Sequence, residues 1–142
     1  LNGCYDANVS IYHANMFSVD RVVISSVDGG RLMTDTNATI ETTLWIVPLP
    51  DAYVYLYGFT SVDVWYVPNI SWSNWTLVMT MTPKSGGVET FTTPQFTLEA
   101  GDVQAVKVIM RYTNSPYVLP NVCSVPPFHS YNDDLVFSVT PF

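Results

Sequence analysis

The clearest pattern in the chain is an alternation of apolar and polar residues with the two-residue period of a β-strand. It is strongest over residues 96–112, which predict a short strand, a tight turn at residues 100–102 and a long strand, arranged as a hairpin. The apolar face of the long strand consists of Val106, Val108, Met110 and Tyr112. The opposite face carries Lys107 and Arg111, so we expect it to face solvent. A sheet with one apolar face packs that face against a second layer, usually another sheet.

Similar alternating segments recur at short intervals along the chain and are separated by glycine- and proline-rich turns. Further strands are predicted at residues 7–14, 19–27, 37–47, 52–59, 62–66, 76–82, 88–92 and 134–140. We expect Leu77, Met79 and Met81 to face inward, and residues 83–87 to form a hairpin loop. No window long enough for a helix has helical periodicity. The sequence therefore predicts a single all-β domain over residues 1–142, an antiparallel β-sandwich of about ten strands, immunoglobulin-like or jelly-roll, without substantial helix.

The composition narrows the range of partners. Charged residues make up only 12% of the chain, and the net charge is −7 at pH 7. A nucleic-acid-binding protein neutralises phosphates with Lys and Arg, so this balance argues against nucleic acid and equally against an anionic membrane surface. No apolar run approaches the roughly eighteen residues of a membrane span, so we expect no membrane insertion.

Four N-x-S/T sequons indicate N-linked glycosylation, and they begin at Asn8, Asn37, Asn69 and Asn74. Glycans would keep a weakly charged surface soluble, so the two features agree. The chain begins at Leu1 rather than Met, which we interpret as a mature N-terminus left by removal of a leader. Together these features predict an extracellular glycoprotein.

The two cysteines, Cys4 and Cys123, lie near opposite ends of the chain. In a secreted protein we expect them to form a disulfide, and the alternative is two buried free thiols. A bond between them would close a loop of about 120 residues, which a chain-entropy estimate values at about 4–5 kcal/mol.

The residues that usually carry catalysis are sparse. His13 lies on a predicted strand face and His129 in a proline-rich loop, and we interpret both as structural. There is no G-x-S-x-G motif and no cluster of Cys and His at zinc spacing. Aspartates in turns, among them Asp28 and the pair Asp133–Asp134, leave calcium as an alternative, although no D-x-D-x-D-G loop is present. We therefore expect no enzyme, no catalytic residue and no required cofactor or metal.

Aromatic residues are abundant, with four Trp, nine Tyr and seven Phe. Their simplest role is packing between sheets, because large rings bury much area. Two functional roles compete with it. Exposed rings such as Trp72 and Trp75 could stack on sugars, or an aromatic strand at residues 53–57 could form a contact between identical subunits.

The segment Thr-Pro-Gln-Phe-Thr-Leu-Glu-Ala-Gly-Asp at residues 93–102, followed by the alternating strand, resembles a hairpin of prokaryotic, especially archaeal, surface β-sandwich domains. With the sequons and the Lys-poor composition, the chain resembles subunits of archaeal extracellular filaments, the glycosylated threads and bundling pili related to TasA-type biofilm fibres. The resemblance implies a homopolymer in which one subunit's terminal strand completes its neighbour's sheet. The implied donor is residues 5–17, with Val9, Ile11 and His13 at the interface, and residues 135–142 are the rival donor.

The sequence thus predicts a secreted, N-glycosylated structural subunit of an extracellular filament. One alternative is a carbohydrate-binding or adhesive β-sandwich module that uses Trp72 and Trp75. Another is an immunoglobulin-like ectodomain of a viral or cell-surface glycoprotein.

Overall fold

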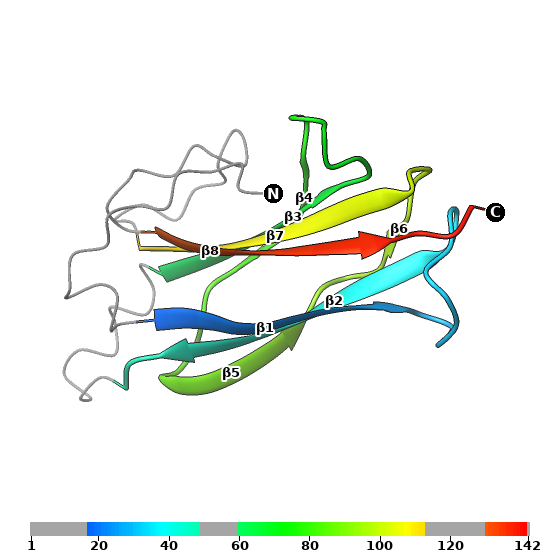
Figure 1. Cartoon of the computed structure of the whole chain (residues 1–142). Helices are drawn as coiled ribbons and strands as arrows, with labels where there is room; N and C mark the ends of the chain where they lie inside the picture. Colours follow the sequence, from blue (N-terminus) through cyan, green and yellow to red (C-terminus); the bar gives the residue numbers. More distant parts are fainter. Residues whose placement is uncertain (1–16, 49–59, 113–129, 142) are drawn as a thin grey trace.

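The computed structural model describes residues 17–48, 60–112 and 130–141, and within these residues the protein is entirely β (Figure 1). Eight strands form two antiparallel four-stranded sheets that pack as a sandwich, without a helix. The strands are β1 (Phe17–Ser26), β2 (Asn37–Ile46), β3 (Thr60–Val67), β4 (Thr76–Met81), β5 (Gly87–Thr92), β6 (Phe96–Thr97), β7 (Val103–Tyr112) and β8 (Ser130–Ser138). The predicted fold class is confirmed. The strands predicted at residues 7–14 and 52–59 lie outside the described residues.

The two sheets have different strand orders. The first has the order β1-β2-β5, with β6 paired to the beginning of β2, and the second has the order β4-β3-β7-β8. The second order is the C′-C-F-G order of an immunoglobulin-type sandwich. In Figure 1 the two sheets lie one above the other, with β1 and β8 on the same side of the sandwich.

The main core lies between the sheets and is formed by alternate residues of the central strands. Its fully buried members include Ala38, Ile40 and Leu44 of β2, Val62 and Val64 of β3, and Val106, Val108 and Met110 of β7. Burying one such side chain contributes about 1.5–3 kcal/mol relative to leaving it exposed, so this layer dominates the stability of the fold. The apolar face predicted for the long strand is therefore confirmed for Val106, Val108 and Met110.

Two predicted hairpins are wrong. Residues 98–102 join β6, which pairs with β2 in the first sheet, to β7 in the second sheet. Residues 82–86 likewise join β4 of the second sheet to β5 of the first. Both segments cross between sheets, because alternation fixes which face of a strand is buried but not which strand lies beside it.

Two β-bulges change which residues of their strands face the core. In β1 the register shifts between Val19 and Arg21, and in β4 the extra residue is Val78. As a result Val78 and Met81 pack against the main core, whereas Leu77 packs against Trp65 on the opposite face. The prediction that Leu77 faces the core with Met81 is therefore wrong, since a bulge places two residues opposite one.

The outer face of the second sheet is buried as well. β3 is buried along its whole length, and Lys107 and Arg111 of β7 are 0% and 1% exposed. The prediction that this face of β7 is open to solvent is wrong. Its charges are buried in pairs, which is how proteins accommodate ionised groups away from water.

Candidate functional site

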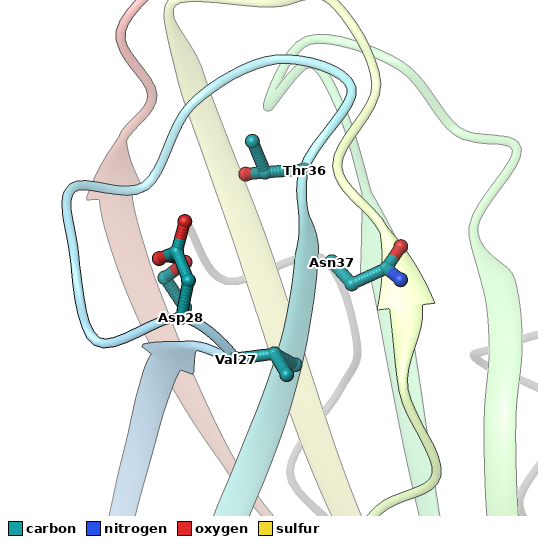
Figure 2. A pocket seen from close by; sticks show the side chains of 5 residues that line it. Val27, Asp28, Thr36 and Asn37 are labelled. Carbon is teal, nitrogen blue, oxygen red and sulfur yellow. Dashed lines mark hydrogen bonds between the residues drawn. The ribbon is translucent and has the colours of Figure 1, made fainter.

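The first described sequon asparagine, Asn37, is exposed at the beginning of β2. Its Oδ1 accepts a hydrogen bond from Thr97 Oγ1 at 3.0 Å, and Figure 2 shows the side chain turned toward β6 and away from Asp28. It lines a hollow of about 240 Å³ together with Ser26, Val27, Asp28 and Thr36. The side-chain nitrogen of Asn37 is not engaged by this hydrogen bond, so the position is open to glycosylation.

Asp28, in the same hollow, holds the turn after β1. Its Oδ1 accepts hydrogen bonds from Ser26 Oγ at 2.6 Å and from the Gly30 amide at 2.9 Å. These two bonds, the Ser26 bond first, lower the pKa of the carboxyl below its usual value. The turn needs a glycine at position 29, where φ is +79°. Asp28 therefore forms a turn rather than an acid–base centre.

The second described sequon folds back on itself. Asn69 is half-buried, and its Oδ1 accepts hydrogen bonds from the Ser71 amide at 2.9 Å and from Ser71 Oγ at 2.6 Å. The Trp72 amide also donates to the Asn69 carbonyl at 3.0 Å. This is an Asx-turn, in which a short polar side chain replaces a backbone bond. The hydroxyl of the sequon is already committed to its own asparagine.

The third described sequon, at Asn74, is exposed and lies beside an exposed indole. Asn74 lines a shallow hollow of about 400 Å³ with Ser71, Trp72 and Ser73, and Trp72 is 48% exposed. An exposed ring next to hydroxyl and amide groups is the chemistry that stacks on and hydrogen-bonds a sugar. The carbohydrate-binding role predicted for Trp72 would place the sugar in this hollow, and it stays a prediction.

Trp75 does not share that surface. Its side chain is half-buried against Trp65 and Ile109 on the outer face of the second sheet. Lys107 Nζ lies 5.6 Å from the Trp75 ring centroid, within the range of a cation–π interaction. Of the two tryptophans predicted to be exposed together, only Trp72 is exposed, because Trp75 packs against the outer face of the second sheet.

Two ion pairs lie on this outer face. Arg111 Nε contacts Asp63 Oδ2 at 2.7 Å, Arg111 Nη2 contacts Oδ1 at 3.4 Å, and Thr80 Oγ1 donates to Oδ1 at 2.7 Å. Lys107 Nζ lies 2.6 Å from Asp134 Oδ1 across β7 and β8. Asp63 and Asp134 are thus committed to cations. Within the described ranges, no three His, Cys, Asp or Glu side chains are grouped so that they could hold a metal ion.

The edge strands differ in charge. β1 carries Asp20 and Arg21, β5 carries Glu89, and β8 carries Asp133 and Asp134. β4 has the uncharged sequence TLVMTM, and β6, which also borders the first sheet, is uncharged but has only two residues. Charges on an edge strand discourage pairing with another chain, so β4 is the least protected of the described edge strands longer than two residues.

The two sheets approach each other more closely on one side of the sandwich than on the other. β1 lies close to β7 and β8, and residues 32–34 pair with Thr140 beside them. On the other side β4 and β5 approach each other less closely, and Val78, Met81 and Phe91 there are only partly buried against the core. The core is therefore less completely covered beside β4 and β5.

Several predicted residues lie outside the described ranges. They are the sequon residue Asn8, the cysteines Cys4 and Cys123, the donor-strand residues Val9, Ile11 and His13, and the loop residue His129. Their roles remain predictions. Sequence reasoning did not single out residues 76–81, although their lack of charge was visible in the sequence.

Comparison with protein-family models finds no match, and comparison with curated proteins finds no significant match. The described part of the chain contains no helix with the length and apolarity needed to cross a membrane. The edges, hollows and sequons described above are therefore the features from which we infer a function.

Proposed function

We propose that this protein is a secreted, N-glycosylated structural subunit that assembles with identical copies into an extracellular filament by exchange of β-strands. One observation carries the proposal. On the side of the sandwich formed by β4 and β5, the core residues Val78, Met81 and Phe91 are only partly covered. A strand supplied by a neighbouring copy would cover them and pair with a free sheet edge.

The physical basis is the hydrogen-bonding capacity of an edge strand. An edge presents a row of unpaired amide and carbonyl groups, and an added strand satisfies them while its alternate side chains enter the core. When each copy gives a strand to the next, the contact is head-to-tail and joins two different surfaces. Such a contact produces an open filament if its rotation does not close into a ring.

The positions of the sequons support an extracellular location. Asn37 is exposed at the beginning of β2, and Asn74 is exposed in the segment that precedes β4. Neither glycan would be attached to β4 itself. Glycans at these positions would also add solubility to a chain in which only 12% of residues are charged.

The test is negative-stain electron microscopy and light scattering of the full chain, before and after boiling in detergent. We expect filaments of constant width that survive detergent, because strand exchange buries a continuous ladder of hydrogen bonds. Raising the salt concentration should promote assembly, since copies with a net charge of −7 repel each other and salt screens that repulsion. A chain that stays monomeric under all these conditions would refute the proposal.

Trp72 favours a second candidate function, binding of a carbohydrate in the hollow that it lines with Ser71, Ser73 and Asn74. Titration with oligosaccharides should then quench tryptophan fluorescence, and Trp72→Ala should abolish the response. Ile70→Ala is a matched control, because Ile70 is a neighbouring exposed apolar residue. A glycan on Asn74 would occupy the same space, so the two uses of this hollow exclude each other.

A further inference from the structure

The two edges that border the poorly covered side of the core, β4 and β5, are not equally suited to accept a strand. β5 carries Glu89, whose Oε2 accepts a hydrogen bond from the Lys84 amide at 3.3 Å. Glu89 pairs in register with Leu44, which places it on the core-facing side of β5. A strand added to β5 would have to pass this carboxylate. β4 presents no such obstacle, because it has no charged residue.

The side chains of β4 show the pattern of a strand with one neighbour. Leu77, Val78, Met79 and Met81 are all half-buried, on both faces of the sheet. The adjacent strand β3, which has neighbours on both sides, is buried at every position. Among the described residues, no strand pairs with the outward edge of β4. Apolar area on both faces of β4 is thus left for a further strand to bury.

The other two edges are less suitable. β1 has a bulge at Asp20 followed by Arg21, and it lies against β8 across the sandwich. β8 carries Asp133 and Asp134 side by side. Bulges and charges are the usual devices that prevent strand addition at an edge. Among the described edge strands longer than two residues, only β4 combines an uncharged sequence with partly exposed apolar side chains.

We propose that the edge of β4 is the acceptor site, and that its occupant is the segment of residues 5–16 from a second copy of this chain. This inference rests on the proposed function. The segment carries one charged residue, Asp6, so it matches the uncharged acceptor. Its alternation would direct Val9, Ile11 and His13 to the uncovered core and the intervening polar residues to the other face.

The length of the segment also fits. Sixteen residues precede β1, which begins at Phe17. An extended chain spans up to about 3.3–3.6 Å per residue, so the twelve residues 5–16 reach about 40 Å. Pairing with the six residues of β4 takes about 20 Å of this length. With Val9, Ile11 and His13 opposite β4, residues 14–16 connect the paired part to β1 and span about 10 Å, so the donor's β1 must begin close to the acceptor's β4.

The test introduces a charge into the acceptor edge of the full-length chain. Met79→Lys places a cation in the middle of β4, and Thr76→Lys does so at an exposed position of the same strand. Because Thr76 is also the third residue of the Asn74 sequon, Asn74→Gln accompanies it as a control that loses the sequon without adding a charge to β4. Val88→Lys is the matched control, because Val88 is 70% exposed on the other edge strand, β5. Circular dichroism verifies that each variant is folded. We expect both β4 variants to remain monomeric in light scattering while Val88→Lys forms filaments like the unmodified chain.

A mixing experiment tests the identity of the occupant. Ile11→Lys should disable the donor segment and leave β4 intact, so this variant alone should stay monomeric. Mixed with Met79→Lys, it should form a one-to-one dimer that grows no further, because only one intact donor and one intact acceptor are present. Two folded variants that fail to form this dimer would overturn the assignment of the segment.

The failures of the two proposals are distinguishable. If the unmodified chain forms filaments and both β4 variants do so equally well, the acceptor site is not β4, and the proposed function stands. If Val88→Lys blocks assembly and Met79→Lys does not, the acceptor is β5. If the unmodified chain never assembles, the proposed function and the inference built on it are both refuted.

Discussion

Replacing Arg111 with methionine should strongly destabilise this protein. Arg111 and Asp63 are 1% and 0% exposed, and their charged groups are joined by contacts of 2.7 and 3.4 Å. Methionine has a similar length and keeps much of the packing, but it removes the positive charge. The Asp63 carboxylate would then be buried with only the Thr80 hydroxyl as a described partner.

The expected loss follows from the burial of the pair. Breaking a buried ion pair by removing one partner costs about 3–5 kcal/mol, because the remaining charge is uncompensated. An exposed pair would cost about 0.2–1 kcal/mol. Since a domain of this size is stable by about 5–15 kcal/mol, the change would consume a large part of its stability. At about 2–4 °C per kcal/mol, the midpoint of thermal unfolding should fall by about 6–20 °C.

The assay is equilibrium unfolding in urea, followed by tryptophan fluorescence and circular dichroism. Arg21→Met is the control, because Arg21 lies on β1 but is exposed, and it should change the free energy of unfolding by less than about 0.5 kcal/mol. The double variant Asp63→Leu with Arg111→Met should recover much of the loss, since replacing both charges by apolar groups of similar volume is often neutral.

Two results would refute this reasoning. The first is a loss of unfolding free energy for Arg111→Met that is as small as the loss for Arg21→Met, which would mean that water or another group compensates the carboxylate. The second is a loss for the double variant that equals the sum of the two single losses. In that case the two side chains would act independently, and the ion pair would contribute nothing through its own coupling.

Three further predictions concern other parts of the molecule. Gly101→Ala should destabilise the fold more than Gly29→Ala, as measured by thermal unfolding, because a Cβ at position 101 would lie 1.9 Å from the Pro68 carbonyl oxygen, whereas position 29 is open. Burial raises the pKa of Tyr66, so the neutral phenol is favoured in the folded state. The neutral phenol therefore contributes its full share of folding stability below pH 10, and this share is lost as the pH rises through the higher folded pKa. Tyr66→Phe should cost about 1–3 kcal/mol near neutral pH and flatten the alkaline decline in stability. Intact-mass analysis of chain made in a glycosylating host should show that Asn74→Gln removes one glycan, and chain bearing no glycan would contradict the secretory interpretation.

Much of the fold was predictable because alternation is a local property. The strands at residues 37–46, 76–81 and 103–112 follow directly from it, and so does the burial of Val106 and Val108. The bulge at Val78 was not predictable, because one extra residue in a strand leaves no mark on composition and appears only when β3 is aligned beside β4.

The burial of the outer face of the second sheet could not be predicted from the sequence for a different reason. Lys107 and Arg111 alternate with apolar residues, which is the usual pattern of a solvated face. Their partners come from other strands: Asp63 is 48 residues from Arg111 in the sequence. Only the strand register brings these charges together. For the same reason the sequence shows that residues 76–81 lack charge but does not show that they form an edge.

The burial of two basic residues also changes how copies of this protein can meet. The chain has five Lys and Arg residues, and with Lys107 and Arg111 buried, the exposed ones are Arg21, Arg31 and Lys84. Two copies, each with a net charge of −7, repel each other, and three exposed cations provide little charge complementarity to offset that repulsion. Association must then depend on uncharged groups, that is, on backbone hydrogen bonds and apolar area. Among the described edge strands longer than two residues, only β4 offers both without a charge, which is why adding a charge there is the most direct way to test assembly.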